Sequence, residues 1–424
     1  MTKTKDFKKL ALAAAAASAL VGPAARADGV EFHGYMRTQV GSTSKGGGLQ
    51  CFGGDGFWPI RAKYRLGNEC DSYGEAMVVA PFGKADGAWA KYNLMLALRE
   101  KNAGDFEASP NDFQIASRQN YVIGGGFFGE NNAFENAKIW VGKRFYNRHD
   151  IHINDHFYWA NTGPGAGIED IELGKVAKFA LAYHSRNPDG NTGNGHPLSD
   201  VIAKRVSARV YDIPVNPNGT LEGEFVYHFG STANPTATEG KGFQLFLEHT
   251  QGKLFGNGYN KIAFVYGSKL GSGFDWLPAN AGATAGAEGK NSWRVHDQLY
   301  FDLPGTNVSG MATATYATIN NTDGSKVKWT SFGVRPQYNF NDNFSIAVEA
   351  GYDEGKAGSD PKRKIAKLTV APQLALSKGF WARPVFRAFA TYAKWNAAMG
   401  TVANGVFGTA TNGMTYGVQV ENWW

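Results

Sequence analysis

The sequence predicts an all-β protein, specifically a large transmembrane antiparallel β-barrel. Three observations favour this fold class. The strand-like segments are apolar on one face only, they run for about 9–11 residues, the length that crosses a bilayer at a tilt, and the chain ends on aromatic residues. The composition excludes two other classes. A chain that is 43% hydrophobic, with 11 Trp, 18 Tyr and 28 Phe, does not stay disordered. Its apolar runs also fall short of the roughly 18 residues that a spanning helix needs.

The first 27 residues have the features of an export signal. Four lysines lie among the first nine residues, residues 10–21 form an apolar stretch, and Ala25-Arg26-Ala27 supplies small residues at the cleavage site. We therefore expect a signal peptide at residues 1–27 and a mature barrel domain at residues 28–424. The leader carries five basic residues and one acidic residue, so it accounts for +4 of the formal net charge of +6. The mature chain thus gives no charge-based support for a nucleic-acid partner.

Two cysteines, Cys51 and Cys70, are separated by 18 residues. In an exported protein, such a pair most simply forms one disulfide that closes a surface loop. A metal site is the alternative, but it needs further ligands at close spacing, and no histidine lies between the two cysteines. We therefore expect a disulfide and no metal ion.

Alternation of apolar and polar residues begins directly after the leader. The apolar face of the first segment carries Val30, Phe32, Met36 and Val40. Its other face carries Glu31, His33, Tyr35, Arg37 and Gln39. Residues 344–352, 368–376 and 384–392 repeat the pattern, and turns rich in Asn, Asp and Gly separate such runs. These segments are predicted to be strands with one face toward lipid.

Aromatic residues cluster near the ends of these runs, as in the interface girdles of membrane barrels. This group comprises Phe32, Tyr35, Tyr64, Tyr338, Phe340 and Tyr392. In the last strand, Tyr416, Val418, Val420 and Trp424 share one face, which is typical of the terminal strand of an outer-membrane barrel. At about 20–24 residues per strand and connection, the mature chain accommodates roughly 16–20 strands around an aqueous lumen. The residues alone therefore predict a large outer-membrane pore.

Several long strings resemble the maltoporin family, and the resemblance extends over residues 30–424. The strings are VEFHGYMR (30–37), KYRLGNEC (63–70), IWVGKRFYNRHDIHINDHFYW (139–159), TGPGAGIEDI (162–171), GFQLFLEHTQ (242–251), FATYAKW (389–395) and VENWW (420–424). The resemblance implies a homotrimer of 18-stranded barrels in the outer-membrane lipid of a Gram-negative bacterium. It also implies facilitated diffusion of maltose and maltodextrins, with no enzymatic activity and no cofactor. It leaves open whether phages use the external loops as a receptor.

The resemblance further implies a line of aromatic side chains along the lumen. The matching positions are Tyr35, Tyr73, Phe106, Tyr259, Trp381 and Trp423. Phe106 is the position that reaches in from a neighbouring subunit, and the family usually has Trp there. Independently, alternation places Tyr35 and Trp423 on the lumen side. For each of these aromatics, the alternative is a place in the outer interface girdle.

A set of charged residues beside this line is implied in the same way. It comprises Arg37, Arg65, Glu75, Arg118, Arg148 and Asp155. At the constriction this chain has Phe157 where the family usually has Tyr, and His156 where a Phe is common. The missing phenol removes one hydroxyl contact, so the preferred sugar stays open. The alternatives are another oligosaccharide such as sucrose, and a non-specific diffusion porin.

Two other motifs could indicate different chemistry. The cluster His149, Asp150, His152, Asp155 and His156 lacks the spacing of a helical zinc site, and we expect it to line an inward-folded loop. The glycines of residues 163–167 lack the lysine of a phosphate loop, and we expect a turn there. An outer-membrane hydrolase would need a nucleophile and base on one strand, and no such pair stands out.

Overall fold

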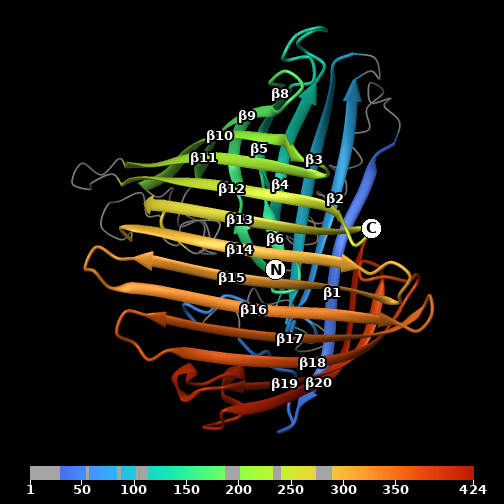
Figure 1. Cartoon of the computed structure of the whole chain (residues 1–424). Helices are drawn as coiled ribbons and strands as arrows, with labels where there is room; N and C mark the ends of the chain where they lie inside the picture. The colour runs from blue at the N-terminus through green and yellow to red at the C-terminus, as the bar shows by residue number, and fades with distance from the viewer. Residues whose placement is uncertain are drawn as a thin grey trace, which may run out of the picture.

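The computed structural model describes residues 29–53, 57–83, 87–101, 105, 113–186, 201–232, 240–273 and 289–424. Across these residues, eighteen strands form one closed antiparallel sheet around a lumen (Figure 1). The predicted fold class is confirmed, as is the strand number that the family resemblance implies. The expected signal peptide at residues 1–27 and the predicted site residue Phe106 lie outside the described residues. Within those ranges, no helix is long and apolar enough to cross a bilayer.

The strands follow one another around the ring in chain order, with one short hairpin interposed after β5. The eighteen barrel strands are β1 (Glu31–Thr43), β2 (Ser72–Gly83), β3 (Trp89–Glu100), β4 (Phe113–Gly125), β5 (Lys138–Arg144), β8 (Gly163–Glu172), β9 (Lys178–Arg186), β10 (Val201–Asn216), β11 (Gly219–Thr232), β12 (Lys241–Leu254), β13 (Gly258–Lys269), β14 (Asn291–Asp302), β15 (Val308–Asn320), β16 (Lys326–Asn339), β17 (Phe344–Ala357), β18 (Arg363–Ala375), β19 (Val385–Trp395) and β20 (Asn412–Trp423). The hairpin consists of β6 (His149–Ile151) and β7 (His156–Trp159). The described residues also contain two single-turn 3-10 helices, η1 (Ala397–Met399) and η2 (Ala403–Gly405). Because β5 pairs directly with β8, the hairpin is not part of the barrel wall.

The ring closes where the first strand meets the last. Tyr35 on β1 pairs with Glu75 on β2 and, on its other side, with Trp423 on β20. This closure matters because a bilayer offers no hydrogen bonds to the backbone groups of an unpaired strand edge. A closed sheet pairs those groups within the protein, which lets the strands cross hydrocarbon.

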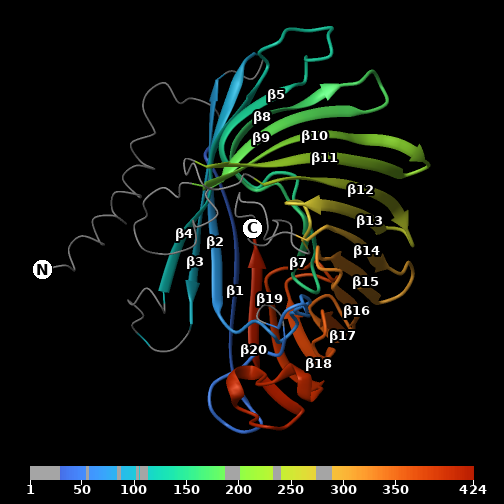
Figure 2. The same ribbon diagram turned by 90° about the vertical axis from the view of Figure 1, so that its left-hand side faces the viewer.

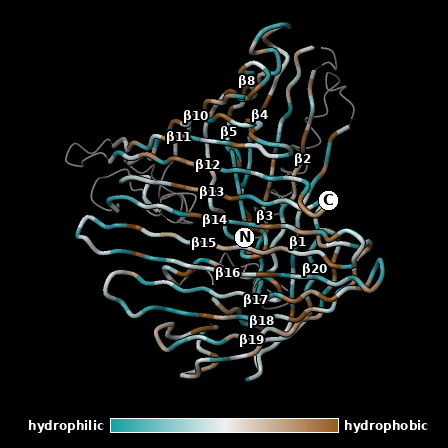
Figure 3. The backbone as a smooth tube through the Cα atoms, in the orientation of Figure 1, coloured by the Kyte–Doolittle hydropathy of each residue, from teal (hydrophilic) through white to brown (hydrophobic). Residues whose placement is uncertain are grey.

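The barrel wall is apolar outside and polar inside, as the alternation predicts. On β19, Phe386 and Tyr392 point outward and are 56% and 46% exposed. Arg387 and Thr391 alternate with them, point inward and are buried. Figure 3 shows the same change between hydrophobic and hydrophilic residues along the other strands.

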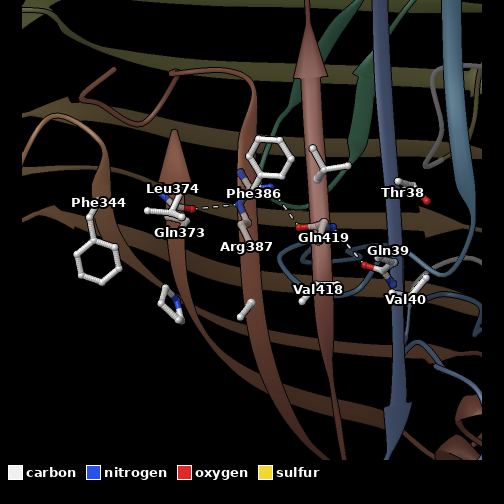
Figure 4. A pocket seen from close by; sticks show the side chains of 13 residues that line it. Thr38, Gln39, Val40, Phe344, Gln373, Leu374, Phe386, Arg387, Val418 and Gln419 are labelled. Carbon is white, nitrogen blue, oxygen red and sulfur yellow. Dashed lines mark hydrogen bonds between the residues drawn. The ribbon is translucent and has the colours of Figure 1, made fainter. Parts of the chain in front are cut away.

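The seam formed by β18, β19, β20 and β1 shows both faces of the wall at close range (Figure 4). On the inner face, Arg387 donates to Gln373 at 3.0 Å and to Gln419 at 3.2 Å, and Gln419 donates to Gln39 at 3.2 Å. On the outer face lies an apolar groove of about 570 Å³. The side chains that line it include Val40, Phe344, Leu374, Phe386 and Val418. The wall is therefore suited to hydrocarbon on one side and to water or polar ligands on the other.

The first inward segment, residues 51–53 and 57–71 of the connection after β1, lies in the lumen. The hydroxyls of Tyr64 and Ser331 are hydrogen-bonded at 2.7 Å, and the Leu66 N–H donates to the Glu349 carboxylate at 2.9 Å. The prediction that Tyr64 belongs to the interface girdle is wrong, because this side chain is 1% exposed and lies inside the barrel. Gly351 makes room for it, since an added Cβ there would overlap the Tyr64 ring.

Residues 145–162, which connect β5 to β8 and contain the hairpin, also turn inward (Figure 2). They meet the first inward segment through backbone hydrogen bonds from Lys63 N–H to Asn154 O at 2.9 Å and from Arg65 N–H to Ile153 O at 3.0 Å. The expectation that residues 149–156 line an inward-folded loop is confirmed. Among the described residues, no cluster of three or more His, Cys, Asp or Glu side chains is arranged to hold a metal ion.

The turn predicted at residues 163–167 is wrong, because these residues begin strand β8. Two of its glycines provide space for rings of the inner wall. A Cβ added at Gly167 would overlap Trp140, and one added at Gly165 would overlap His184. Glycine therefore serves close packing here, although a glycine-rich string in isolation is typical of a turn.

Cys51 and Cys70 form a disulfide in the structure and tie the two ends of the first inward segment together. We expect the mature protein to contain no free thiol, because both of its cysteines are then consumed. Thiol titration of the unfolded, unreduced protein tests this pairing. A count of two thiols per chain would contradict it, and the same titration after reduction is the positive control.

Candidate functional site

Aromatic side chains form a row along the inner wall. Ring centroids are 6.3 Å apart for Tyr73 and Tyr35, and 6.3 Å apart for Trp423 and Trp381. Tyr35 and Trp423 are cross-strand partners at the seam between β1 and β20, so they join the two pairs. The row draws on β2, β1, β20 and the turn before β19, so residues from the two ends of the chain come together through closure of the barrel.

Tyr300 extends this row and was missed by the sequence analysis. Its ring lies 5.6 Å from Trp381 and 5.6 Å from Tyr259, so it links these two predicted positions. It sits on β14 in phase with the inward-facing His296 and Gln298. Alternation within residues 291–302 could have identified it, because the two neighbouring inward positions are polar while Tyr300 is aromatic.

Trp381 reaches the lumen from the turn between β18 and β19. The buried Phe380 packs edge-on against it at 4.8 Å, which holds the turn inward. Beside it, the Arg383 guanidinium lies 3.9 Å from the ring centroid of Trp423 and donates to Glu421 at 2.8 Å. His152, on the inward hairpin segment, approaches Trp381 at 5.0 Å from the other side.

A network of charged groups flanks the row near Tyr35. The Tyr35 hydroxyl accepts a hydrogen bond from Arg65 and donates to Glu421 at 3.2 Å. Arg65 and Arg37 both approach Glu69, at 2.6 Å and 3.2 Å. Burial alone would raise the pKa of the Glu69 carboxyl, but Lys63, Arg65 and Arg37 lower it to about 2. Glu69 therefore stays ionised and compensates the cations around it.

The other predicted charged residues extend this network toward the hairpin. Asp155 lies 4.0 Å from Arg37, and Glu75 lies 3.7 Å from Arg118. Glu75 also accepts a hydrogen bond from the Tyr73 hydroxyl at 2.6 Å, so the charged set touches the aromatic row directly.

Arg148 contacts Phe157, the residue that the resemblance places at the constriction. Its guanidinium carbon lies 3.9 Å from the ring centroid of Phe157 and 4.3 Å from that of Phe145, so two phenyl rings hold it in place. His156 points into the wall and packs edge-on against Trp329 at 4.8 Å. Burial, together with the nearby arginines, lowers the pKa of His156 to about 3. This histidine is therefore neutral and packs as an aromatic ring. A Phe, which is common at this position in the family, would pack in the same way.

Aromatic and charged residues meet in a lumen cavity of about 300 Å³. Its lining includes the charged residues Arg148 and Asp150 and the aromatic residues Tyr259 and Trp381. The remaining lining residues are His149, His152, Lys261 and Gln298. Lys261 and Gln298 were not predicted, because single inward polar residues are common in any barrel of this kind. The cavity therefore brings aromatic rings together with hydrogen-bonding groups of both charges.

A closed barrel with an apolar outer wall and a polar lumen narrowed by inward segments is an outer-membrane porin. The chain belongs to the LamB porin family, whose model matches residues 30–424, and this confirms the family resemblance. The family and the fold place the protein in the outer membrane of a Gram-negative bacterium and indicate a channel.

Solved structures of other porins resemble the chain more distantly. OmpT of Vibrio cholerae, described in its trimer form, is 10% identical with a TM-score of 0.41, over 93% of this chain and 99% of that one. OmpF of Salmonella typhi, in complex with daunomycin, is 9% identical with a TM-score of 0.49, over 93% and 97%. OpdK of Pseudomonas aeruginosa, with vanillate, is 10% identical with a TM-score of 0.48, over 93% and 99%. This likeness says nothing about the ligand of the present chain.

The position of Arg148 leads to a test of ion selectivity. Arg148→Ala removes one positive charge from the constriction, so the pore should shift toward cations. The reversal potential across a bilayer with a KCl gradient measures this shift. Lys253→Ala, which removes the same charge at an exposed position next to the turn after β12, should leave the reversal potential unchanged. Equal potentials for the native protein and Arg148→Ala would contradict the placement of Arg148 in the ion path.

Proposed function

We propose that this porin gives facilitated diffusion of maltose and maltodextrins through its aromatic-lined lumen. The observation that carries the proposal is the row Tyr73, Tyr35, Trp423, Trp381, Tyr300 and Tyr259, with charged groups beside it. A glucose unit has an apolar ring face that stacks on an aromatic side chain, and a rim of hydroxyls that needs polar partners. Each part of the sugar thus has a matching surface.

Movement along the row requires many weak sites of similar strength. Neighbouring rings lie 5.6 to 6.3 Å apart where they contact, so a sugar can begin to stack on the next ring before it leaves the last. Conduction through channels follows the same rule, because a single deep site would trap the permeating molecule. On this proposal, the cavity lined by Arg148 and Trp381 is one such site.

Two alternatives concern the identity of the solute. Phe157 lacks the hydroxyl that the family usually presents at the constriction, so another oligosaccharide such as sucrose is the nearest alternative. A non-specific diffusion porin is the second. The aromatic row disfavours it, because a line of partly exposed aromatic rings is not needed for the passage of ions and small polar solutes.

We also propose a homotrimer, in which Phe106 of each subunit reaches the lumen of its neighbour. The support is the match of GDFEAS to the loop that makes this contact in the resembling family. Light scattering in detergent, corrected for bound detergent, should give a mass three times that of one chain. A stable monomer would contradict the proposal, and Phe106→Ala should then leave sugar binding unchanged.

Trp381→Ala and Trp423→Ala should each weaken maltotriose binding about 2- to 12-fold. The reason is that aromatic stacking contributes about 0.5–1.5 kcal/mol beyond area burial. Both variants also widen the lumen slightly, so ion conductance should hold steady or rise. Sugar-dependent block of the ion current in planar bilayers measures both quantities.

Trp293→Ala is the matched control for these variants. Trp293 lies on the outer face of β14, where it packs against Tyr316 at 5.0 Å, so its truncation should not affect sugar block. If Trp381→Ala and Trp423→Ala bind maltotriose as well as the native protein does, these residues are not part of the sugar path. In a non-specific porin, sugar block would be absent before and after each substitution.

A further inference from the structure

Glu224 on β11 is a buried wall carboxylate that contacts both arms of the inward hairpin segment. It is 2% exposed and faces the lumen. One oxygen accepts from Asn147 Nδ2 and from Trp159 Nε1, each at 2.6 Å, and the other accepts from Asn161 Nδ2 at 2.6 Å. Asn147 precedes β6, Trp159 ends β7 and Asn161 follows it. A single carboxylate therefore holds the segment where it enters and leaves the hairpin.

Two neighbouring glutamates bind the same segment. The His149 ring lies between them, with Nε2 3.3 Å from Glu222 and Nδ1 3.2 Å from Glu248. Glu248 also accepts a hydrogen bond from the Tyr158 hydroxyl. Burial lowers the pKa of His149, but hydrogen bonds and charge from the two carboxylates raise it to about 9. The imidazole is therefore charged at neutral pH and attracted to both.

Apolar packing supports the same attachment. The Trp159 ring stacks on Phe246 of β12 at 4.8 Å, with 12° between the planes. The hairpin segment is thus fixed to β11 and β12 on one side, while its tip contacts residues 63–65 on the other. Between these attachments lie Arg148 and Asp150, the charged residues that line the lumen cavity.

We infer that Glu224, with Glu222 and Glu248, is a positioning residue that holds the constriction hairpin at a fixed place, so that Arg148 and Asp150 stay preset for the permeating sugar. The sugar part of this inference rests on the proposed function, whereas the attachment of the hairpin does not. Hydrogen bonds to a charged, buried acceptor are strong, and a buried donor that loses this acceptor destabilises the folded state. Removing the charge should therefore free the arms of the hairpin and leave the barrel wall intact.

Glu224→Gln tests the inference with the least change in shape. The new amide nitrogen donates hydrogen bonds but cannot accept them, so one side of the residue 224 side chain would face the donors of the hairpin segment with a donor of its own. Single-channel recordings in KCl without sugar should show brief closures and raised open-channel noise. With maltotriose, the dissociation rate should rise about three- to tenfold, whereas the association rate should stay within about twofold.

Two further variants separate positioning from a general loss of stability. Trp159→Phe removes one donor to Glu224 and keeps a ring against Phe246, and it should reproduce the noise in weaker form. Asp170→Asn is the control, because this wall carboxylate bonds Lys138 at 2.6 Å and Tyr211 at 2.6 Å, outside the hairpin segment. It should leave both noise and sugar rates at native values.

The outcomes distinguish the inference from the proposed function. Native noise and native sugar kinetics in both Glu224→Gln and Trp159→Phe would overturn the inference. If Glu224→Gln does not assemble, Trp159→Phe alone decides. If the native channel shows no sugar block, the proposed function fails, and the noise measurement still tests the hairpin attachment. Equal noise in Asp170→Asn and Glu224→Gln would assign the effect to the wall and overturn the positioning role.

Discussion

The structure depends on one constraint, which is that every backbone N–H and C=O group of a strand in hydrocarbon must be hydrogen-bonded within the protein. Pairing of β1 with β20 meets this constraint by closing the sheet. Closure in turn fixes the alternation, because one face of each strand must be apolar for lipid while the other is enclosed. With this many strands, the enclosed face surrounds a lumen wide enough to hold side chains, inward segments and solute.

The inward segments turn that wide lumen into a narrow and chemically specific path. Burying charged groups in these segments is tolerable where opposite charges lie beside them. Glu69 among Arg37, Lys63 and Arg65 is one such group, and His149 between Glu222 and Glu248 is another. The same networks place cations, carboxylates and aromatic rings at the constriction, where a sugar needs all three on our proposal.

The fold was predictable from the sequence because alternation, strand length and the aromatic C-terminus all follow from the bilayer. The strand number was not, since chain length allowed a range and only the family resemblance selected eighteen. Local sequence patterns gave wrong predictions where contacts between distant parts of the chain determine the position of a residue. Tyr64 occupies a position typical of the girdle, but it lies inside the barrel. The glycines within residues 163–167 belong to a strand, where two of them leave space for neighbouring rings. Tyr300 is not among the positions that the resemblance implies, and only the alternation along its strand marks it. The wall glutamates were missed because their partners on the hairpin segment lie 63 to 99 residues away in the chain.

The central claim is that the lumen binds glucose polymers along an extended row of weak sites. The most direct test is the conductance of the unmodified channel in a planar bilayer, titrated with maltose and with maltodextrins of increasing length. The account predicts saturable block of the ion current, with an affinity that rises with chain length until the polymer spans the row. Absence of block, or block that grows only with molecular size for unrelated polymers as well, would contradict it.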